Sequence, residues 1–152
     1  MEDTLKLKGT YTIEVRDTSG NVTKKEINNL VVNAGLAQLA LLAGDASATP
    51  FTYLAVGTST TAAAASQTAL QAEITDTGLA RASATVSRVT TTVTNDTLQL
   101  VYTWTASGTK TVEEVGVFNA ASSGTMLSRA LTGSTPLVNG SQPSITYKLK
   151  FS

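Results

Sequence analysis

Strict alternation of apolar and polar residues is the feature that most limits what this chain can fold into. Near the start, the apolar residues fall on odd positions: Leu5, Leu7, Gly9, Tyr11, Ile13 and Val15. Near the end, the same spacing recurs at Ile145, Tyr147, Leu149 and Phe151. Neighbouring residues of a strand point to opposite faces, so a period of two predicts half-buried strands and not helices.

Turn residues divide the alternating segments into short, evenly spaced runs. Asp17 to Asn21 predicts a turn between the first run and a partner strand at Val22 to Ile27, which together make a hairpin. Between Ala80 and Val93 the apolar phase changes at Ser87-Arg88, which predicts a bulge or a bend where one strand crosses between sheets.

The remaining segments complete a fold prediction that is mainly β. Ala34 to Leu42 has helical spacing, with Asn33 as the expected N-cap, and a single helical turn is expected at Ser66 to Ala72. Thr132 to Pro143 reads as a loop. We predict an antiparallel β-sandwich, with residues 1–152 as a single domain. The prediction follows from about eight strands, one short helix after the N-terminal hairpin and the lack of alternating strands and helices.

Composition excludes several classes of function. The 152 residues include no histidine and no cysteine, which removes imidazole bases, thiol nucleophiles, disulfides and nearly all zinc chemistry. Formal net charge is +0 with 14% charged residues, so we expect no nucleic-acid partner. No apolar run approaches the roughly 18 residues of a membrane span, so neither a membrane partner nor a secretory leader is expected.

Carboxylate pairs are the one catalytic route left, and the spacing does not favour them. Glu113 and Glu114 are adjacent on a predicted strand, so their side chains point to opposite faces. Glu73 and Asp76 would share a face only if their segment were helical. We therefore expect no enzymatic activity, no catalytic residue, no metal and no cofactor.

The segment from Thr111 to Asn119 is predicted to be the central strand. Val115 and Val117 alternate with Gly116 and Phe118, and glycine lets another backbone approach closely, which indicates a strand covered on both faces. A Ser-Gly turn leads to a second strand from Met126 to Leu131. Glu113 or Glu114 is expected to pair with Arg129 across this hairpin.

This central segment is part of a resemblance to a known group of proteins. It combines with three earlier segments: Asn29 to Leu36, Tyr53 to Thr58, and Leu70 to Glu73. In this order they resemble the small structural proteins of tailed bacteriophages, in particular tail-collar and tail-fibre attachment domains. The resemblance implies that four residues determine the fold and do not form a catalytic site: Glu114, Gly116, Phe118 and Arg129.

The resemblance implies a non-enzymatic virion protein that is assembled in the host cytoplasm. Its expected place is the tail or baseplate, as a fibre-type attachment protein, and its expected partners are further copies of itself, as a trimer, and other virion proteins. A capsid decoration protein is the alternative. Exposed-looking positions supply the candidate interface residues: Leu7, Tyr11, Ile13, Thr60, Thr61, Leu137 and Asn139.

A receptor-binding or glycan-binding module is the third reading of the sequence. Such a module would place aromatic residues in loops, where they can stack on a sugar. Here Trp104 and Tyr102 share a strand face with Leu98 and Leu100, so we expect them in the core.

Overall fold

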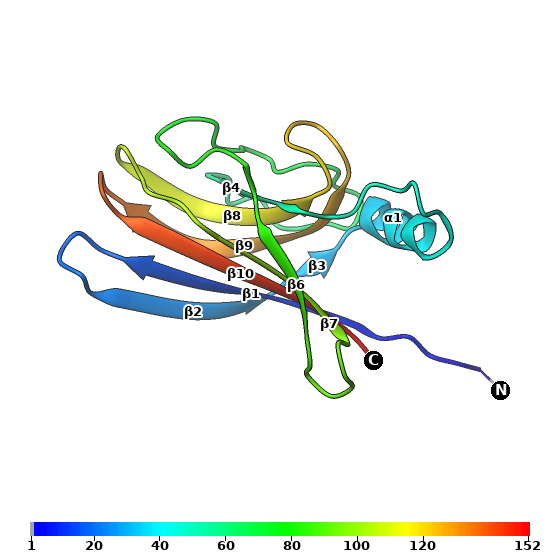
Figure 1. Cartoon of the computed structure of the whole chain (residues 1–152). Coiled ribbons are helices and arrows are strands. Elements are labelled where there is room, and N and C mark those ends of the chain that lie inside the picture. Colours follow the sequence, from blue (N-terminus) through cyan, green and yellow to red (C-terminus); the bar gives the residue numbers. More distant parts are fainter. Residues whose placement is uncertain (1) are drawn as a thin grey trace.

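The computed structural model describes residues 2–152 and shows two antiparallel sheets stacked face to face (Figure 1). The first sheet has the order β2-β1-β10-β7-β6, and the second has the order β3-β9-β8-β4-β5. The predicted antiparallel β-sandwich is confirmed. The elements, in chain order, are β1 Leu7–Arg16, β2 Val22–Asn28, β3 Leu30–Val31, α1 Asn33–Gly44, β4 Tyr53–Gly57, β5 Ala82–Ser83, β6 Thr85–Val89, β7 Thr97–Thr103, β8 Lys110–Phe118, β9 Met126–Leu137 and β10 Gln142–Phe151.

The core lies between the two sheets and follows from the period-two pattern. In the first sheet, β1 pairs with β10 so that Tyr11 stands opposite Tyr147, and Ile13 stands opposite Ile145. All four of these side chains are buried, as the alternation predicts. Val115 and Val117 face them from the second sheet and belong to the same core cluster. A one-residue slip of any of these strands would turn its apolar side chains outward, so burial fixes the register.

Two buried tyrosines make hydrogen bonds through their hydroxyl groups, and the bond of Tyr11 links the two sheets. The rings of Tyr11 and Tyr147 lie 4.7 Å apart between centroids. The hydroxyl of Tyr11 shares a hydrogen bond of 2.7 Å with the hydroxyl of Ser128 in β9. The amide of Asn29 donates to the hydroxyl of Tyr147 over 3.1 Å. Burial is the main reason why the pKa of each tyrosine lies above its ordinary value, because burial disfavours the phenolate.

These two tyrosines predict a loss of stability at alkaline pH. The folded-state pKa is raised, so the stabilisation is fully present below the unfolded value of about 10 and is lost as the pH rises above it. Each tyrosine adds a slope that approaches about 1.4 kcal/mol per pH unit. Urea unfolding between pH 8 and pH 11 should show this slope, and it should be about half as steep in Tyr11→Phe. An equal slope in that variant would contradict the assignment.

The chain crosses between the sheets after β5. Ala82–Ser83 pairs with β4 in the second sheet, whereas Thr85–Val89 pairs with β7 in the first sheet. The predicted crossing is therefore present, but it lies at Ala84 and not at Ser87-Arg88. The backbone N–H of Ala84 donates to the carbonyl of Thr52 over 2.8 Å, which holds the crossing point.

Helix α1 lies at one end of the sandwich and packs on β9 (Figure 1). The prediction of Asn33 as its N-cap is wrong, because Asn33 is the first helical residue and Val32 takes the cap position without a side-chain bond. The N–H of Asn33 donates to the carbonyl of Ala65 instead. Gly35 is buried, and a Cβ there would collide with the backbone of Leu127. Glycine at this position therefore allows the helix to pack closely on β9.

Two further predictions about local structure are wrong. Residues 66–72 form turns and bends, and no helix is present there. The predicted loop from Thr132 to Pro143 is mostly strand, since β9 continues to Leu137 and pairs with β8, with a register shift between Val112 and Glu114. Thr132 fits this strand because its hydroxyl donates to the carbonyl of Val112 over 3.1 Å. Hydroxyl residues bonded to a neighbouring backbone look like loop residues in a sequence.

Candidate functional site

Strand β8 is the middle strand of the second sheet and presents different chemistry on its two faces. Val115 and Val117 point into the core cluster between the sheets. Glu114, Gly116 and Phe118 occupy the alternate positions and are also buried. The segment from Gln67 to Arg81 covers this second face through the contacts described below. The prediction of an inner strand covered on both faces is confirmed.

A fully buried ion pair lies on this covered face. The Nε atom of Arg129 donates to Oε2 of Glu114 over 2.7 Å, and both side chains have 0% exposure. Gly116 stands opposite Arg129 in the β8–β9 register, so Glu114 reaches it diagonally. The predicted pairing is confirmed, with Glu114 as the acid and not Glu113. Removing both charges from water is costly, and further hydrogen bonds to the pair offset part of that cost.

Those hydrogen bonds come from the segment that covers the pair. The backbone N–H groups of Ala72 and Gln71 donate to the two carboxylate oxygens of Glu114, over 2.7 and 3.1 Å. Nη1 of Arg129 donates to Oε1 of Gln67 over 3.1 Å. We call Glu114, Arg129, Gln67 and the two backbone groups the buried ion-pair network. It fastens an irregular segment onto the sheet through charge-assisted bonds, which are stronger than neutral ones.

Two glycines make room for this covering segment. A Cβ at Gly57 would collide with the carboxylate of Glu114 and the carbonyl of Ala72. A Cβ at Gly116 would approach Leu70 and the carbonyl of Ser128 too closely. The predicted close approach at Gly116 is therefore real, and the nearest atom belongs to the Leu70 side chain.

Phe118 and Arg81 form a second anchor for the same segment. The Arg81 guanidinium lies 3.6 Å from the centroid of the Phe118 ring, an attractive cation–π geometry. It also donates to both carboxylate oxygens of Glu73, over 2.9 and 2.6 Å. Asp76 instead bonds Lys110, so the helical face that Glu73 and Asp76 would have shared does not exist. Sequence reasoning missed Arg81, because the irregular segment from Glu73 to Arg81 has no period that would bring the two charges together.

The charged side chains of this region are paired with one another within the chain. In residues 2–152, Nη2 of Arg129 is the one buried side-chain nitrogen or oxygen without a hydrogen-bond partner. Glu114 and Glu73 are both neutralised by arginines, so neither carboxylate stands free beside a cavity. The described residues contain no group of three acidic, histidine or cysteine side chains that could hold a metal. None of their helices has the length and apolarity to cross a membrane.

The structure sorts the candidate interface residues into exposed and buried sets. Thr60, Thr61 and Asn139 are exposed, and Leu7 is half-buried. Tyr11, Ile13 and Leu137 are core residues with at most 3% exposure, so choosing them as surface contacts was a mistake. The alternation itself explains the correction, because the apolar positions of a half-buried strand face inward and the polar ones face solvent.

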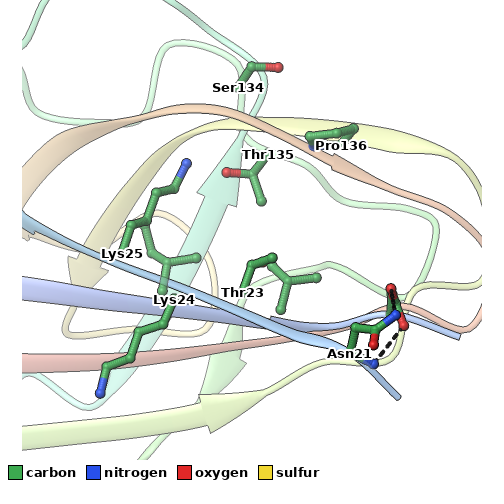
Figure 2. Close-up of a pocket in the computed structure, with 10 residues that line it drawn as sticks. Asn21, Thr23, Lys24, Lys25, Ser134, Thr135 and Pro136 are labelled. Atoms are coloured by element: carbon green, nitrogen blue, oxygen red, sulfur yellow. Dashed lines mark hydrogen bonds between the residues drawn. The ribbon is translucent and has the colours of Figure 1, made fainter. Parts of the chain in front are cut away.

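An open groove lies between β2 and the second half of β9 (Figure 2). Its volume is about 400 Å³, and Ile13 and Val15 are among the residues that line it. Lys25 points toward the β9 side, where its ammonium lies 3.4 Å from the carbonyl of Gly133, whereas Lys24 points away from it (Figure 2). The lining residues include no aromatic side chain, so the groove lacks the flat apolar surface on which sugars stack.

Trp104 is a core residue, as predicted. Its side chain is 3% exposed, and its indole N–H donates to the carbonyl of Ala80 over 2.8 Å. Tyr102 packs edge-on against it with 4.8 Å between ring centroids. This aromatic pair is therefore not arranged as a sugar-stacking surface.

These features define an antiparallel β-sandwich protein in which the buried charged side chains hold segments of the fold together. A protein-family model described as podophage GP4 fiber I protein gp80 matches residues 27–148. The chain belongs to this family of phage fibre proteins, which supports a structural role in the virion. The predicted relationship to tailed-phage fibre proteins is confirmed. Comparison with curated proteins and with solved structures finds no match.

Proposed function

We propose that this chain is a non-enzymatic, fibre-type attachment protein at the tail or baseplate of a tailed phage, where it assembles as a homotrimer by burying weakly charged surface. The observation that carries the proposal is the family match, which spans residues 27–148 and so includes β8, β9 and the buried ion-pair network. The pairing of Glu114 and Glu73 with arginines agrees with a structural role for these carboxylates.

Assembly by surface burial agrees with the charge content of the chain. A typical stable interface buries about 800 Å² on each partner. Burying a charged group without a partner is costly, whereas burying threonine, serine and alanine avoids the cost of removing an ion from water. With 14% charged residues and a formal net charge of +0, this chain can bury surface against its own copies without accumulating like charge.

The location is tested on purified phage particles. We expect gold-labelled antibodies against this chain to decorate the tail tip or baseplate, and we expect mass spectrometry to find the chain in isolated tails. Labelling over the head would identify a capsid decoration protein instead. Absence from particles would contradict the virion role. A glycan array with binding that a folded Trp104→Ala variant loses would favour a receptor-binding module.

A further inference from the structure

Four lysines gather on the outer face of the first sheet, at the end where β1 begins and β10 ends. In the β1–β10 register, Lys8 stands directly opposite Lys150, so both side chains leave the same face of the sheet. Lys148 lies two residues earlier on β10 and therefore shares this face. Lys6 exchanges both backbone hydrogen bonds with Ser152, which continues the register by one pair and adds a fourth lysine. We call Lys6, Lys8, Lys148 and Lys150 the lysine patch.

The lysine patch faces solvent. Lys6, Lys8 and Lys148 are exposed, and Lys150 is half-buried. Leu149, between the two lysines of β10, belongs to the core cluster on the opposite face. The ammonium of Lys150 donates to the neutral hydroxyl of Thr92 over 2.6 Å. The ion pairs of residues 2–152 involve other basic side chains and none of these four lysines.

The nearest acidic side chains along the chain are not paired with the patch. Asp96 lies in the loop before β7, where its carboxylate accepts three backbone N–H groups of that loop and the hydroxyl of Thr97. Glu2 and Asp3 precede the patch in sequence, but both are exposed, and the chain there leads away from the sheet (Figure 1). Within residues 2–152, the four positive charges therefore have no paired acid.

This arrangement works against the stability of the sheet. Like charges directly opposite each other on paired strands are destabilising, and Lys8 and Lys150 occupy such a pair. At the other end of the same face, opposite charges are placed in register. Glu14 stands opposite Lys24 there, with 3.7 Å between the carboxylate oxygen and the ammonium nitrogen. The stability of the fold therefore does not account for the lysine patch.

We propose that the lysine patch is a docking surface for an acidic segment of a partner protein. Alternate residues of a strand lie on one face about 6.6 Å apart, and the patch offers this spacing twice, once along each of its two paired segments. An extended segment with aspartate or glutamate at alternate positions matches this spacing and supplies the missing counter-charge. The inference goes beyond the proposed function, because it does not depend on the homotrimer.

The surroundings of the patch favour a protein over a nucleic acid or a membrane. The residues that stand beside the lysines in the cross-strand register are Thr10, Gln99, Ser87, Thr97 and Val89. They include no aromatic side chain, on which the bases of a single-stranded nucleic acid would stack. They include a single aliphatic side chain, whereas segments that lie on membrane surfaces place several large apolar residues beside their basic ones. Carboxylates of a protein are the anions that this polar surface fits.

Fluorescence anisotropy with a labelled peptide of alternating glutamate and threonine tests the proposal. We expect the parent chain to bind this peptide at low salt and to lose it as salt rises, because exposed charges are screened. The same peptide with glutamine in place of glutamate should not bind. Lys8→Gln/Lys148→Gln should weaken binding of the glutamate peptide about fivefold or more, since it removes two exposed ion-pairing positions.

Arg16→Gln/Lys24→Gln is the matched control, because it removes two positive charges from the other end of the same sheet face. This control should bind the glutamate peptide as the parent chain does. Equal losses from the two double variants would indicate attraction by net charge and would overturn the docking surface. Failure of the parent chain to bind the peptide would overturn it as well.

Two further measurements check the role of the lysines and the class of partner. Lys8→Gln/Lys148→Gln should unfold at the same urea concentration as the parent chain or at a higher one, because like-charge repulsion is relieved. A clear loss of stability would assign these lysines to the fold and would contradict the proposal. Tighter binding of oligothymidylate, or of phosphatidylserine vesicles, than of the glutamate peptide would overturn the assignment of a protein partner.

Discussion

Arg129→Met is expected to destabilise the folded chain by about 3–5 kcal/mol, the cost of leaving one partner of a buried ion pair without its counter-charge. Glu114 would remain at 0% exposure with the backbone N–H groups of Gln71 and Ala72 as its donors. Methionine fills much of the arginine volume, so the loss reports mainly the missing charge and hydrogen bonds. Trp104 is the one tryptophan and is buried, so its fluorescence follows unfolding in urea at a fixed protein concentration.

Two further variants show whether the loss comes from breaking the Glu114–Arg129 ion pair or from any change at this part of the sheet. Glu113→Gln makes a comparable change one residue away at a partly exposed site and should cost little. The double variant Glu114→Gln/Arg129→Met removes both charges and should recover part of the loss, because no charge then remains buried alone. An Arg129→Met chain as stable as the parent would show that the network does not hold the segment from Gln67 to Ala72.

Gly57→Ala is expected to cost about 1–3 kcal/mol or more, although it adds a single methyl group. The new Cβ would meet the Glu114 carboxylate and the carbonyl of Ala72, and neither can withdraw easily because they are bonded to each other's segment. Glu114 belongs to the buried ion-pair network, and the Ala72 carbonyl accepts the N–H of Thr58 over 2.9 Å, so the methyl group would push the covering segment away from β4. Limited proteolysis should show new cleavage near residues 67–72.

Gly44→Ala is the matched control for this substitution. A Cβ at Gly44 meets nothing within 4 Å, and the residue ends helix α1, where alanine is a better helix former than glycine. Its unfolding free energy should be unchanged or slightly raised. Equal losses from the two alanines would indicate a general sensitivity to glycine replacement and would contradict this displacement of the covering segment.

The sequence predicted the strands whose signal is local and missed the parts fixed by distant contacts. Burial on one face leaves a period of two, so the hairpin of β1 and β2 and the last strand were predictable. The central strand was predictable from its apolar run around Gly116, which indicated burial on both faces. The second half of β9 was missed because Thr132 and Thr135 resemble loop residues until their backbone partners are known. The helix start was misplaced by one residue because the carbonyl of Val32, whose N–H is bonded to Leu127 in β9, accepts the first helical hydrogen bond from Leu36.

The candidate site was predictable as a pair but not as a network. Opposite charges on adjoining strands indicated Glu113 or Glu114 with Arg129, since the hairpin brings them together, and the structure shows that the acid is Glu114. Nothing local indicates that Gln67, Gln71 and Ala72 supply the remaining hydrogen bonds, because the covering segment has no regular period. The helical spacing of α1 was visible in the sequence, but apolar helices are usually buried, so the exposure of Leu36 and Leu41 became evident only from the three-dimensional arrangement.

The pairing of the first and last strands has a mechanical consequence. Leu7 stands opposite Phe151, Ser152 donates to the carbonyl of Lys6, and the two ends of the chain emerge on the same side (Figure 1). Tension applied to both ends would load the outermost hydrogen bonds first and peel β1 from β10 one pair at a time, which requires little force. In the homo-oligomer proposed above, a load would be carried better through lateral contacts between subunits than along the polypeptide itself.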